Sequence, residues 1–589
     1  MDRNTVLRWA FIALAAFAFM KWGPNIFGKK EGSSQSIPFE SYVSTPGYAP
    51  DGADWPPPAE NPPEGELCDI KGNRFEAQLS SRGASLVHYW LRDSQYAEGT
   101  NGYDLATTQQ ERWRTLRTLF RGEGADDQLK YDRFPWKLEK IGDTGCAFSY
   151  EDADVSIKKT VTAGTRPFEL NVETSITNLD DAPKKHRFSI SAFAFRMNKD
   201  VKGKLGRTSP FATDLQCARD GDVTRKPKDG FKEGWYREPL VDRFTAISDS
   251  YFAQALVPSV AFAPGAPDGT EKPECSLLAE DKAAKNQDMD ADESGDVYHA
   301  TLTYPPATLA PHQTSTYSLI AYIGPKERNV LAKAAGGGAK LGDLINLGFF
   351  SPVARVLVGA LVFFHGPLQN WGLAIIALTL CLRIGLFPLS WKQIQTSIAM
   401  KKLKPELDEL NKRFPDDAQA RQMATMEIYR KNGVNPLGGC LPQLVQLPVW
   451  WAMWATLQTA VEMYHEKFLW ITDLSAPDKY FILPIVYGVF IVLQQRITPQ
   501  QGMDPMQQKM MTYMMPGLFT VLVLFLPAAL GIYMLTSSAL GIGQQLVVQK
   551  IVPTDPTTPK KGEIVVKQVK AEDGAGAKTP AFGKGKARV

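Results

Sequence analysis

Arg383 is the residue whose type and position point most directly to chemistry in this chain. It ends an uncharged apolar run that begins at Val356, and a positive charge inside such a helix costs on the order of 3 kcal/mol in a membrane. One interpretation is that its side chain reaches the nearby membrane surface beside Pro388. The other is that it lines a water-filled cavity between helices, together with Thr379 one turn earlier on the same face.

Polar side chains in other apolar runs are candidates to line the same cavity. Gln443 and Gln446 share one helix face, and Tyr533 and Ser537 share a face of a later helix. Each pair alone is also explained as a hydrogen-bonding contact between helices. Because the apolar runs contain no acidic residue to neutralise Arg383, the set favours an open, hydrated and positively charged groove over a buried ion pair.

Methionines are concentrated between residues 503 and 515. Flexible thioether side chains suit surfaces that bind varied apolar partners. Packing at a helix end also explains them. The residues that we take as candidates for partner contact are Met506, Met510 and Met514.

Metal, cofactor and thiol chemistry are not predicted. The six cysteines show no metal or redox spacing and are expected to be buried single thiols, with Cys381 and Cys440 packed in apolar runs. The six histidines form no cluster, so no metal site is expected. No residue is assigned a catalytic role, and the net charge of +3 argues against wholesale nucleic-acid binding. The other cysteines are Cys68, Cys146, Cys217 and Cys275.

The groove residues must be positioned by membrane-spanning helices. The uncharged stretch from Met510 to Gln549 would be ~60 Å long as one helix, twice the thickness of a hydrocarbon core, so two helices with a turn at Pro527–Ala529 are predicted. Residues 391–434 carry nine Lys or Arg residues and are expected to form a cytoplasmic helical hairpin. If the domain before residue 344 is exported, the chain crosses the membrane only once between that domain and the cytoplasmic hairpin. Residues 344–366 are therefore assigned to an interfacial amphipathic helix. The spans are then 370–389 for the second and 436–549 for the third to sixth.

The remaining segments complete this topology. Residues 1–27 have a basic front and an apolar stretch and are expected to be an N-terminal signal-anchor span, with a cleaved signal as the alternative. Residues 28–66 form a Pro-rich linker, and residues 550–589 form a basic tail that is expected to be cytoplasmic. Both termini are then cytoplasmic and residues 28–340 are exported.

Residues 67–335 contain segments in which apolar and polar residues alternate, a pattern typical of half-buried β-strands. Apolar and polar residues alternate from Phe168 to Ile176, from Phe188 to Ala194 and from Thr316 to Ile323, which predicts a large antiparallel sandwich. The predicted fold is therefore an α-helical polytopic membrane domain, a five-span core plus an N-terminal anchor, joined to a large all-β exported domain. No catalytic constellation is recognisable in the β region.

Three motifs in residues 340–550 resemble the YidC/Oxa/Alb family of membrane protein insertases, in its six-span Gram-negative form. They are Asn435–Pro442, Trp470–Ser475 and Asp504–Lys509. Arg383, Thr379 and Tyr533 fall on positions that match the family's groove. Further upstream, Gly83–Leu86 and the β pattern resemble the family's periplasmic supersandwich more loosely.

The resemblance implies a non-enzymatic insertase and chaperone of the bacterial inner membrane. It would insert nascent membrane proteins into the lipid bilayer, alone or beside the Sec translocon, and would bind the ribosome through the cytoplasmic hairpin and the basic tail. Residues 28–340 would be periplasmic. Because nothing in the exported domain carries chemistry, much of residues 67–300 is expected to be dispensable for basic insertion, provided that the interfacial helix 344–366 remains.

Two other classes of membrane protein compete with this interpretation. A polytopic transporter with a periplasmic accessory domain would be expected to show inverted repeats or paired charges at mid-membrane, and neither is recognisable. A membrane enzyme would need acid–base or nucleophilic groups near the bilayer. His365 and His465 are the histidines near the spans, and neither belongs to a matching signature.

Overall fold

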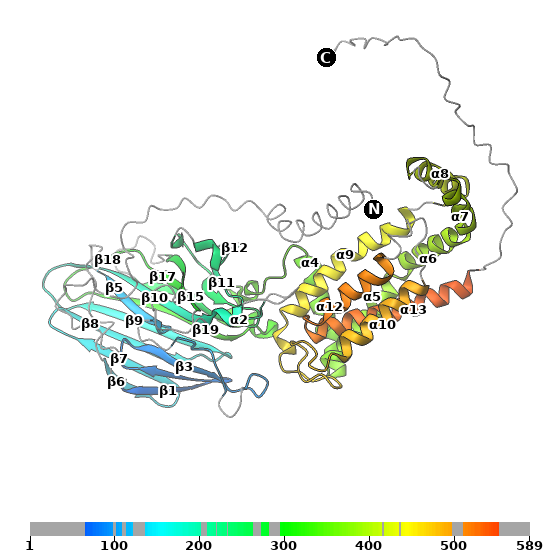
Figure 1. Ribbon diagram of the computed structural model, residues 1–589. Coiled ribbons are helices and arrows are strands. Elements are labelled where there is room, and N and C mark those ends of the chain that lie inside the picture. Colours follow the sequence, from blue (N-terminus) through cyan, green and yellow to red (C-terminus); the bar gives the residue numbers. More distant parts are fainter. Residues whose placement is uncertain are drawn as a thin grey trace, which may run out of the picture.

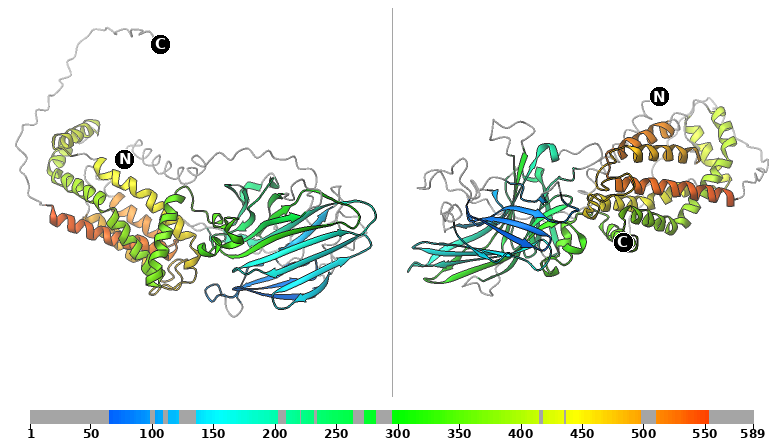
Figure 2. Two further views of the ribbon diagram at one scale, coloured as in Figure 1. Left: turned by 180° about the vertical axis from the view of Figure 1, so that it is seen from behind. Right: turned by 90° about the horizontal axis from the view of Figure 1, so that it is seen from below.

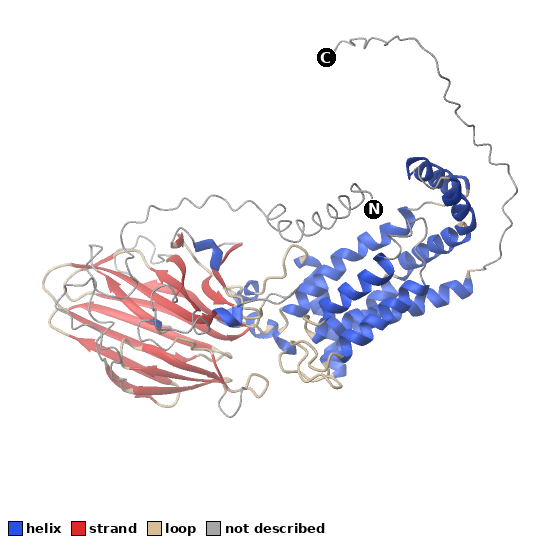
Figure 3. Cartoon of the chain, viewed as in Figure 1, coloured by secondary structure: helices blue, strands red, loops and turns tan. Residues whose placement is uncertain are grey.

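The chain consists of an all-β domain joined to a bundle of helices (Figures 1 and 3). The structure is a computed structural model that describes residues 65–97, 102–108, 113–121, 136–201, 209–219, 221–231, 234–262, 272–281, 295–414, 418–434, 437–497 and 510–552. The predicted N-terminal span, nearly all of the Pro-rich linker and the basic tail after residue 552 lie outside these residues.

The β-domain contains three sheets, and every strand pairing in its described part is antiparallel. The four-stranded sheet has the order β1 (Leu67–Gly72), β2 (Phe75–Ser80), β3 (Ser85–Leu91), β4 (Tyr103–Asp104). The nine-stranded sheet has the order β12 (Asp222–Pro227), β11 (Asp214–Arg219), β14 (Phe244–Ser248), β15 (Phe252–Phe262), β19 (Thr314–Pro325), β9 (Glu169–Asn178), β8 (Val155–Ala163), β7 (Gly145–Glu151), β6 (Lys137–Ile141). The six-stranded sheet has the order β13 (Tyr236–Glu238), β16 (Glu274–Asp281), β17 (Gly295–Thr303), β10 (Lys184–Met197), β18 (Ala307–Leu309), with β5 (Arg117–Arg121) also paired to β10.

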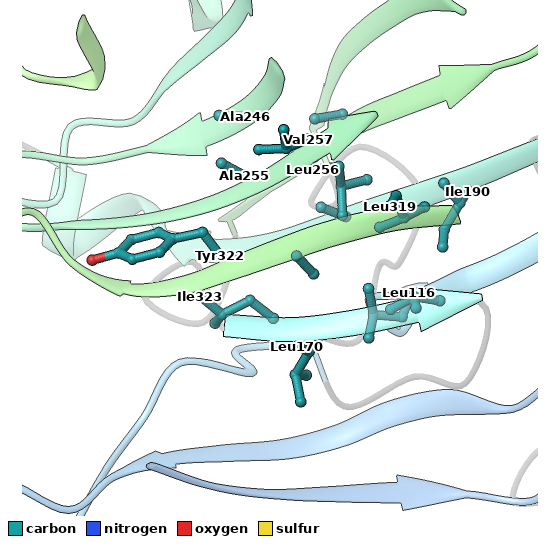
Figure 4. Close-up of a cluster of buried hydrophobic side chains, with 14 of the residues drawn as sticks. Leu116, Leu170, Ile190, Ala246, Ala255, Leu256, Val257, Leu319, Tyr322 and Ile323 are labelled. Carbon is teal, nitrogen blue, oxygen red and sulfur yellow. The ribbon is translucent and has the colours of Figure 1, made fainter. Parts of the chain in front are cut away.

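The strands predicted from alternation are present and bury the predicted faces. In β9, Leu170, Val172 and Ile176 are buried, whereas Asn171 and Glu173 between them are exposed. In β10 the predicted apolar residues are also buried, but so are Ser189, Ser191 and Phe193 between them, so both faces of this strand are covered. Figure 4 shows Leu319 of β19 close to Ile190 of β10. The cluster of buried apolar residues includes members of all three sheets.

Four cysteines form two disulfides, so the expectation that they are buried single thiols is wrong. Cys68 of β1 is bonded to Cys146 of β7, and Cys217 of β11 is bonded to Cys275 of β16. The partners are 78 and 58 residues apart, and only the packing of one sheet on another brings them together. Each bridge therefore ties the nine-stranded sheet to a different neighbouring sheet. Cys381 is free and exposed, contrary to the packed position expected for it.

The chain contains short helices and a bundle of longer ones. The short ones are α2 (Asn198–Val201), η3 (Lys228–Phe231), α3 (Arg328–Leu331), η4 (Ala334–Gly337), η5 (Leu341–Leu344) and η6 (Val461–Met463). Of these, α3, η4 and η5 are the short helices that connect β19 to the bundle. The bundle and the helices attached to it are α4 (Ser351–Leu368), α5 (Trp371–Gly385), α6 (Phe387–Lys402), α7 (Lys404–Arg413), α8 (Ala418–Lys431), α9 (Leu437–Gln458), α10 (Ile482–Ile497), η7 (Met510–Met514), α12 (Met515–Val523) and α13 (Ala528–Ile551). A second cluster of buried apolar residues joins α4, α5, α9, α10, α12 and α13.

The helix boundaries differ from those expected in two places. The helix expected at 344–366 begins later, at Ser351, and continues through Pro367 to Leu368. The segment expected as the span 370–389 is bent by 64° between α5 and α6, so its straight part ends at Gly385. Its start agrees with the prediction, because the Asn370 side chain accepts the Leu373 backbone N–H at 3.0 Å and caps α5.

The apolar helices are short. Among the described helices, α4 alone is long and apolar enough to cross a bilayer by itself, and α5 with α6 qualifies if the bent pair counts as one span. α10 and residues 512–523 are apolar but shorter. The break predicted near Pro527 agrees with the structure, since α12 ends at Val523 and α13 begins at Ala528, but it lies before Ala528 and Ala529, which belong to α13.

The predicted hairpin is formed by α7 and α8, and Leu407 of α7 and Tyr429 of α8 form a buried cluster with Leu403, which precedes α7. Residues 415–417, which connect the two helices, lie outside the described residues. The hairpin lies at the end of the helical part that is farther from the β-domain (Figures 1 and 2).

Candidate functional site

Arg383, near the end of α5, is held against α13. One guanidinium nitrogen, Nη2, donates to both the backbone oxygen and the hydroxyl of Ser537, at 2.7 Å each. The Arg383 backbone oxygen accepts a hydrogen bond from Gln544 Nε2 at 3.0 Å. The side chain is half-buried, and the sequences of α5, α9, α10, α12 and α13 contain no Asp or Glu. The arginine is therefore a partly sheltered positive charge whose hydrogen-bond partners are neutral.

Two other predicted groove residues lie in the same core but are more deeply buried. Tyr533 is 4% exposed and Thr379 is 1% exposed. The Thr379 hydroxyl donates to the backbone oxygen of Ile375 at 2.7 Å, so its hydrogen-bonding capacity is used within α5. Tyr533 and Ser537 are one turn apart on α13, as predicted, and Arg383 approaches this face.

The remaining predicted residues are only partly described. Gln446 is half-buried on α9, whereas the side chain of Gln443 lies outside the described residues. Met510 is half-buried and Met514 is 53% exposed, and Met506 lies outside the described residues. The structure thus brings together Arg383, Tyr533 and Ser537, and it leaves the glutamine and methionine predictions untested.

Gly541 and Gln544 belong to this site and were missed in the sequence. A Cβ atom on Gly541 would lie 3.4 Å from Arg383 Nη2, so the absence of a side chain gives the guanidinium room against α13. Both residues continue the helix face of Tyr533 and Ser537 by further turns. Continuing the helical spacing of Tyr533 and Ser537 along the sequence predicts that Gly541 and Gln544 lie on the same face of the helix.

Gly541→Leu is expected to displace the guanidinium from Ser537, because the leucine carbons beyond Cβ would need the space that it fills. Hydrogen bonds that involve a charged group are worth ~1.5–3 kcal/mol, so a loss of about tenfold in any activity that uses Arg383 is expected. The matched control is Gly543→Leu, since a Cβ there meets nothing within 4 Å. Equal activity of the two variants would contradict the placement of Arg383.

Apolar side chains on the outside of the bundle form a second feature of the site. Ile485 and Val489 of α10 and Leu518 and Val521 of α12 are exposed, and these two helices pack against each other. Large exposed apolar surfaces mark contact with a membrane or with another protein. In the described part of the chain no group of His, Cys, Asp or Glu could hold a metal ion.

Comparisons with known proteins match both parts of the chain. The family model described as "60Kd inner membrane protein" matches residues 363–555, and the one described as "YidC periplasmic domain" matches residues 67–360. The protein named "Membrane protein insertase YidC" of Anaeromyxobacter dehalogenans (strain 2CP-C) is 44% identical over 244 residues, which cover 41% of this chain and 44% of the relative. This chain thus spans less than half the length of such relatives.

Other matches are longer and more distant. The protein of the same name from Geotalea daltonii is 28% identical over 565 residues, covering 94% of this chain and all of the relative. A solved structure entitled "Active YidC insertase crystal structure with the first transmembrane domain resolved" is 17% identical and has a TM-score of 0.35, covering 82% of this chain and 94% of that one.

The two family models and the architecture define a class: an inner-membrane protein with a helical core that carries a large all-β domain. With both models matched in order along one chain, the protein belongs to the YidC family of membrane protein insertases. Members of this family are insertases and not enzymes.

Proposed function

We propose that this chain inserts nascent membrane proteins into the bacterial inner membrane, and helps them to fold, through a hydrophilic and positively charged groove between α5 and α13. The observation that carries the proposal is Arg383, a charge on an apolar helix that is held by Ser537 and has no acidic residue on the surrounding helices. Such a charge is costly inside a membrane unless water or an anionic group reaches it.

The groove attracts an acidic, hydrophilic segment of the client while the client's apolar segment moves into lipid along the bundle. The exposed apolar faces of α10 and α12 offer a surface for that movement. Met510 and Met514 are the proposed client contacts next to it, because thioether side chains adapt to varied apolar partners. No energy source is needed in the protein, since burial of ~20 apolar client residues drives the step.

Short helices contribute to the same mechanism. α5 has 15 residues and α10 has 16, which correspond to ~22 and ~24 Å of helix. A hydrocarbon core is ~30 Å thick, and spans shorter than this thin the bilayer locally. A thinner bilayer shortens the distance over which a polar client segment is carried.

The proposed orientation places the β-domain in the periplasm and the α7–α8 hairpin and both termini in the cytoplasm, with six spans in all. The two disulfides support the periplasmic side, because structural disulfides persist in oxidising compartments. The basic residues of the hairpin support the cytoplasmic side. In this orientation the hairpin and the basic tail face the ribosome, and the chain acts alone or beside the Sec translocon.

The proposal is tested by reconstituting the purified full chain into liposomes. A single-span client with a short acidic tail is synthesised in their presence, and insertion is measured as the fraction of the tail protected from added protease. Protection several-fold above that of liposomes without the chain is expected. Equal protection in both would overturn the proposal, and solute flux measured in the same liposomes tests the transporter alternative.

A further inference from the structure

The connection between α9 and α10 is inserted into the β-domain. Tyr464 is 8% exposed and Val461 is fully buried, and both belong to the β-domain's core cluster although they follow α9 in sequence. The Tyr464 ring lies among three aromatic rings of the β-domain, with centroid distances of 6.1 Å to Tyr96, 5.4 Å to Tyr251 and 5.8 Å to Phe252. These rings form an aromatic socket, and tilted or edge-on packing of this kind is favourable.

Polar contacts surround the aromatic socket. The guanidinium of Arg328 and the carboxylate of Glu462 are 2.5 Å apart, and the Arg328 backbone N–H donates to the other Glu462 oxygen at 3.2 Å. Each side chain of this pair is 16% exposed, so water and salt screen it less than a surface pair. The side chain of Gln95 donates to backbone oxygens of the connection, at 3.1 to 3.4 Å, on Val461, Glu462 and Tyr464.

The same connection closes on itself and on the start of α13. Glu466 lies two residues after Tyr464, and its backbone oxygen accepts the Leu474 backbone N–H at 3.0 Å. The backbone N–H groups of Ala529 and Ala528 donate to the oxygens of Leu474 and Ala476, at 2.9 and 2.8 Å. First-turn N–H groups have no partner within their own helix, so the connection supplies the acceptors that fix where α13 begins.

The start of α10 is fixed by the same segment. Asp478 accepts the backbone N–H groups of Tyr480 and Leu483 and the indole N–H of Trp470, at 2.8 to 3.2 Å. A carboxylate is favourable at a helix N-terminus. One connection therefore contacts the β-domain on one side and holds the first turns of two bundle helices on the other.

We propose that the aromatic socket and Arg328 form a docking site for residues 461–465, and that docking there holds the N-terminal turn of α13 and so the groove helix itself. α13 carries Tyr533 and Ser537, one and two turns beyond the turn that the connection caps. The docking is a property of the fold alone. Its consequence for the groove rests on the proposed function.

This inference narrows the expectation that much of residues 67–300 is dispensable for insertion. Tyr96, Tyr251 and Phe252 lie within residues 67–300. Deletion of these residues would expose Tyr464 and would remove the contacts that hold the connection between α9 and α10. Loss of the β-domain is then expected to loosen α13 even though the β-domain contributes no side chain to the groove.

The test is hydrogen–deuterium exchange of the purified full chain in detergent, read at the peptide that contains Ala528 and Ala529. Reversal of one charge, Glu462→Arg or Arg328→Glu, is expected to make these amides exchange at least tenfold faster. The double reversal, Arg328→Glu with Glu462→Arg, is expected to restore slow exchange, because the pair is reformed with its charges exchanged. The matched control is Lys71→Glu, since Lys71 forms an ion pair on the β-domain surface, where both side chains are exposed.

Unchanged exchange in the single reversals would overturn the proposal, and so would fast exchange that the double reversal does not repair. If the single reversals do not accumulate in the membrane, accumulation of the double reversal supports the pair, and its failure to accumulate overturns it. Tyr464→Phe keeps the ring and is expected to exchange slowly, whereas Tyr464→Ala is expected to exchange fast. Because exchange is read without clients, a failure of the proposed function would leave these results unaffected.

Discussion

Arg383→Glu is expected to reduce the insertion of clients with acidic translocated segments at least tenfold. Two unit charges ~5 Å apart interact by about 3 kcal/mol at an effective dielectric constant of 20, and the substitution turns this attraction into repulsion. Each 1.4 kcal/mol is a factor of ten in affinity. Arg383→Ala is expected to have a smaller effect, and Arg383→Lys is expected to keep most activity because the positive charge remains.

The measurement is protease protection for a pair of clients that differ only in the acidity of the tail, at matched amounts of the chain in the liposomes. Neutral-tailed clients should be affected less than acidic ones. The matched control is Arg355→Glu, because Arg355 carries the same charge on the exposed side of α4. Equal defects for both clients would mean that Arg383 acts through stability and not through charge, as expected if it only reaches toward a membrane surface.

Replacing Cys217 and Cys275 together by Ala is expected to lower the free energy of unfolding of the β-domain by about 2–5 kcal/mol. The bridge closes a loop of 58 residues, and a cross-link of that length removes considerable conformational freedom from the unfolded chain. It also joins β11 of the nine-stranded sheet to β16 of the six-stranded sheet, so its loss removes a covalent link between these two sheets.

The stability is measured on the purified full chain by pulse proteolysis in urea, with β-domain fragments identified by mass spectrometry. A lower urea midpoint is expected for the double replacement and also for the wild-type chain with reductant. Cys381→Ser is the control, because that thiol is free and exposed, and it should leave the midpoint unchanged. An unchanged midpoint in the double replacement would show that the bridge contributes nothing to stability.

The local elements of this fold could be predicted because each has its own pattern. Strict alternation in β9 and the proline before α13 depend on neighbouring residues alone, and both predictions agree with the structure. The two disulfides could not be predicted, because their partners meet only after the sheets have packed. The bend after Gly385 was also missed, since the apolar run continues through it and Pro388 is compatible with the first turn of the next helix.

The site could be predicted in part for the same reason. Arg383 is conspicuous because a charge interrupts an apolar run, and Ser537 because it repeats Tyr533 by one turn. Gly541 has no polar group, and its role is visible only when the guanidinium lies against it. The aromatic socket for Tyr464 joins residues more than two hundred positions apart, which no local pattern can reveal.

The order of the docking residues along the chain bears on how the protein is made. The aromatic socket and Arg328 are translated first, and Glu462 follows 134 residues after Arg328. At about 5–20 residues per second, the ribosome takes roughly 7–27 s to cover that distance. The β-domain therefore has time to fold before residues 461–465 emerge from the ribosome. The helices after α9 are then added to a chain in which the aromatic socket is already formed.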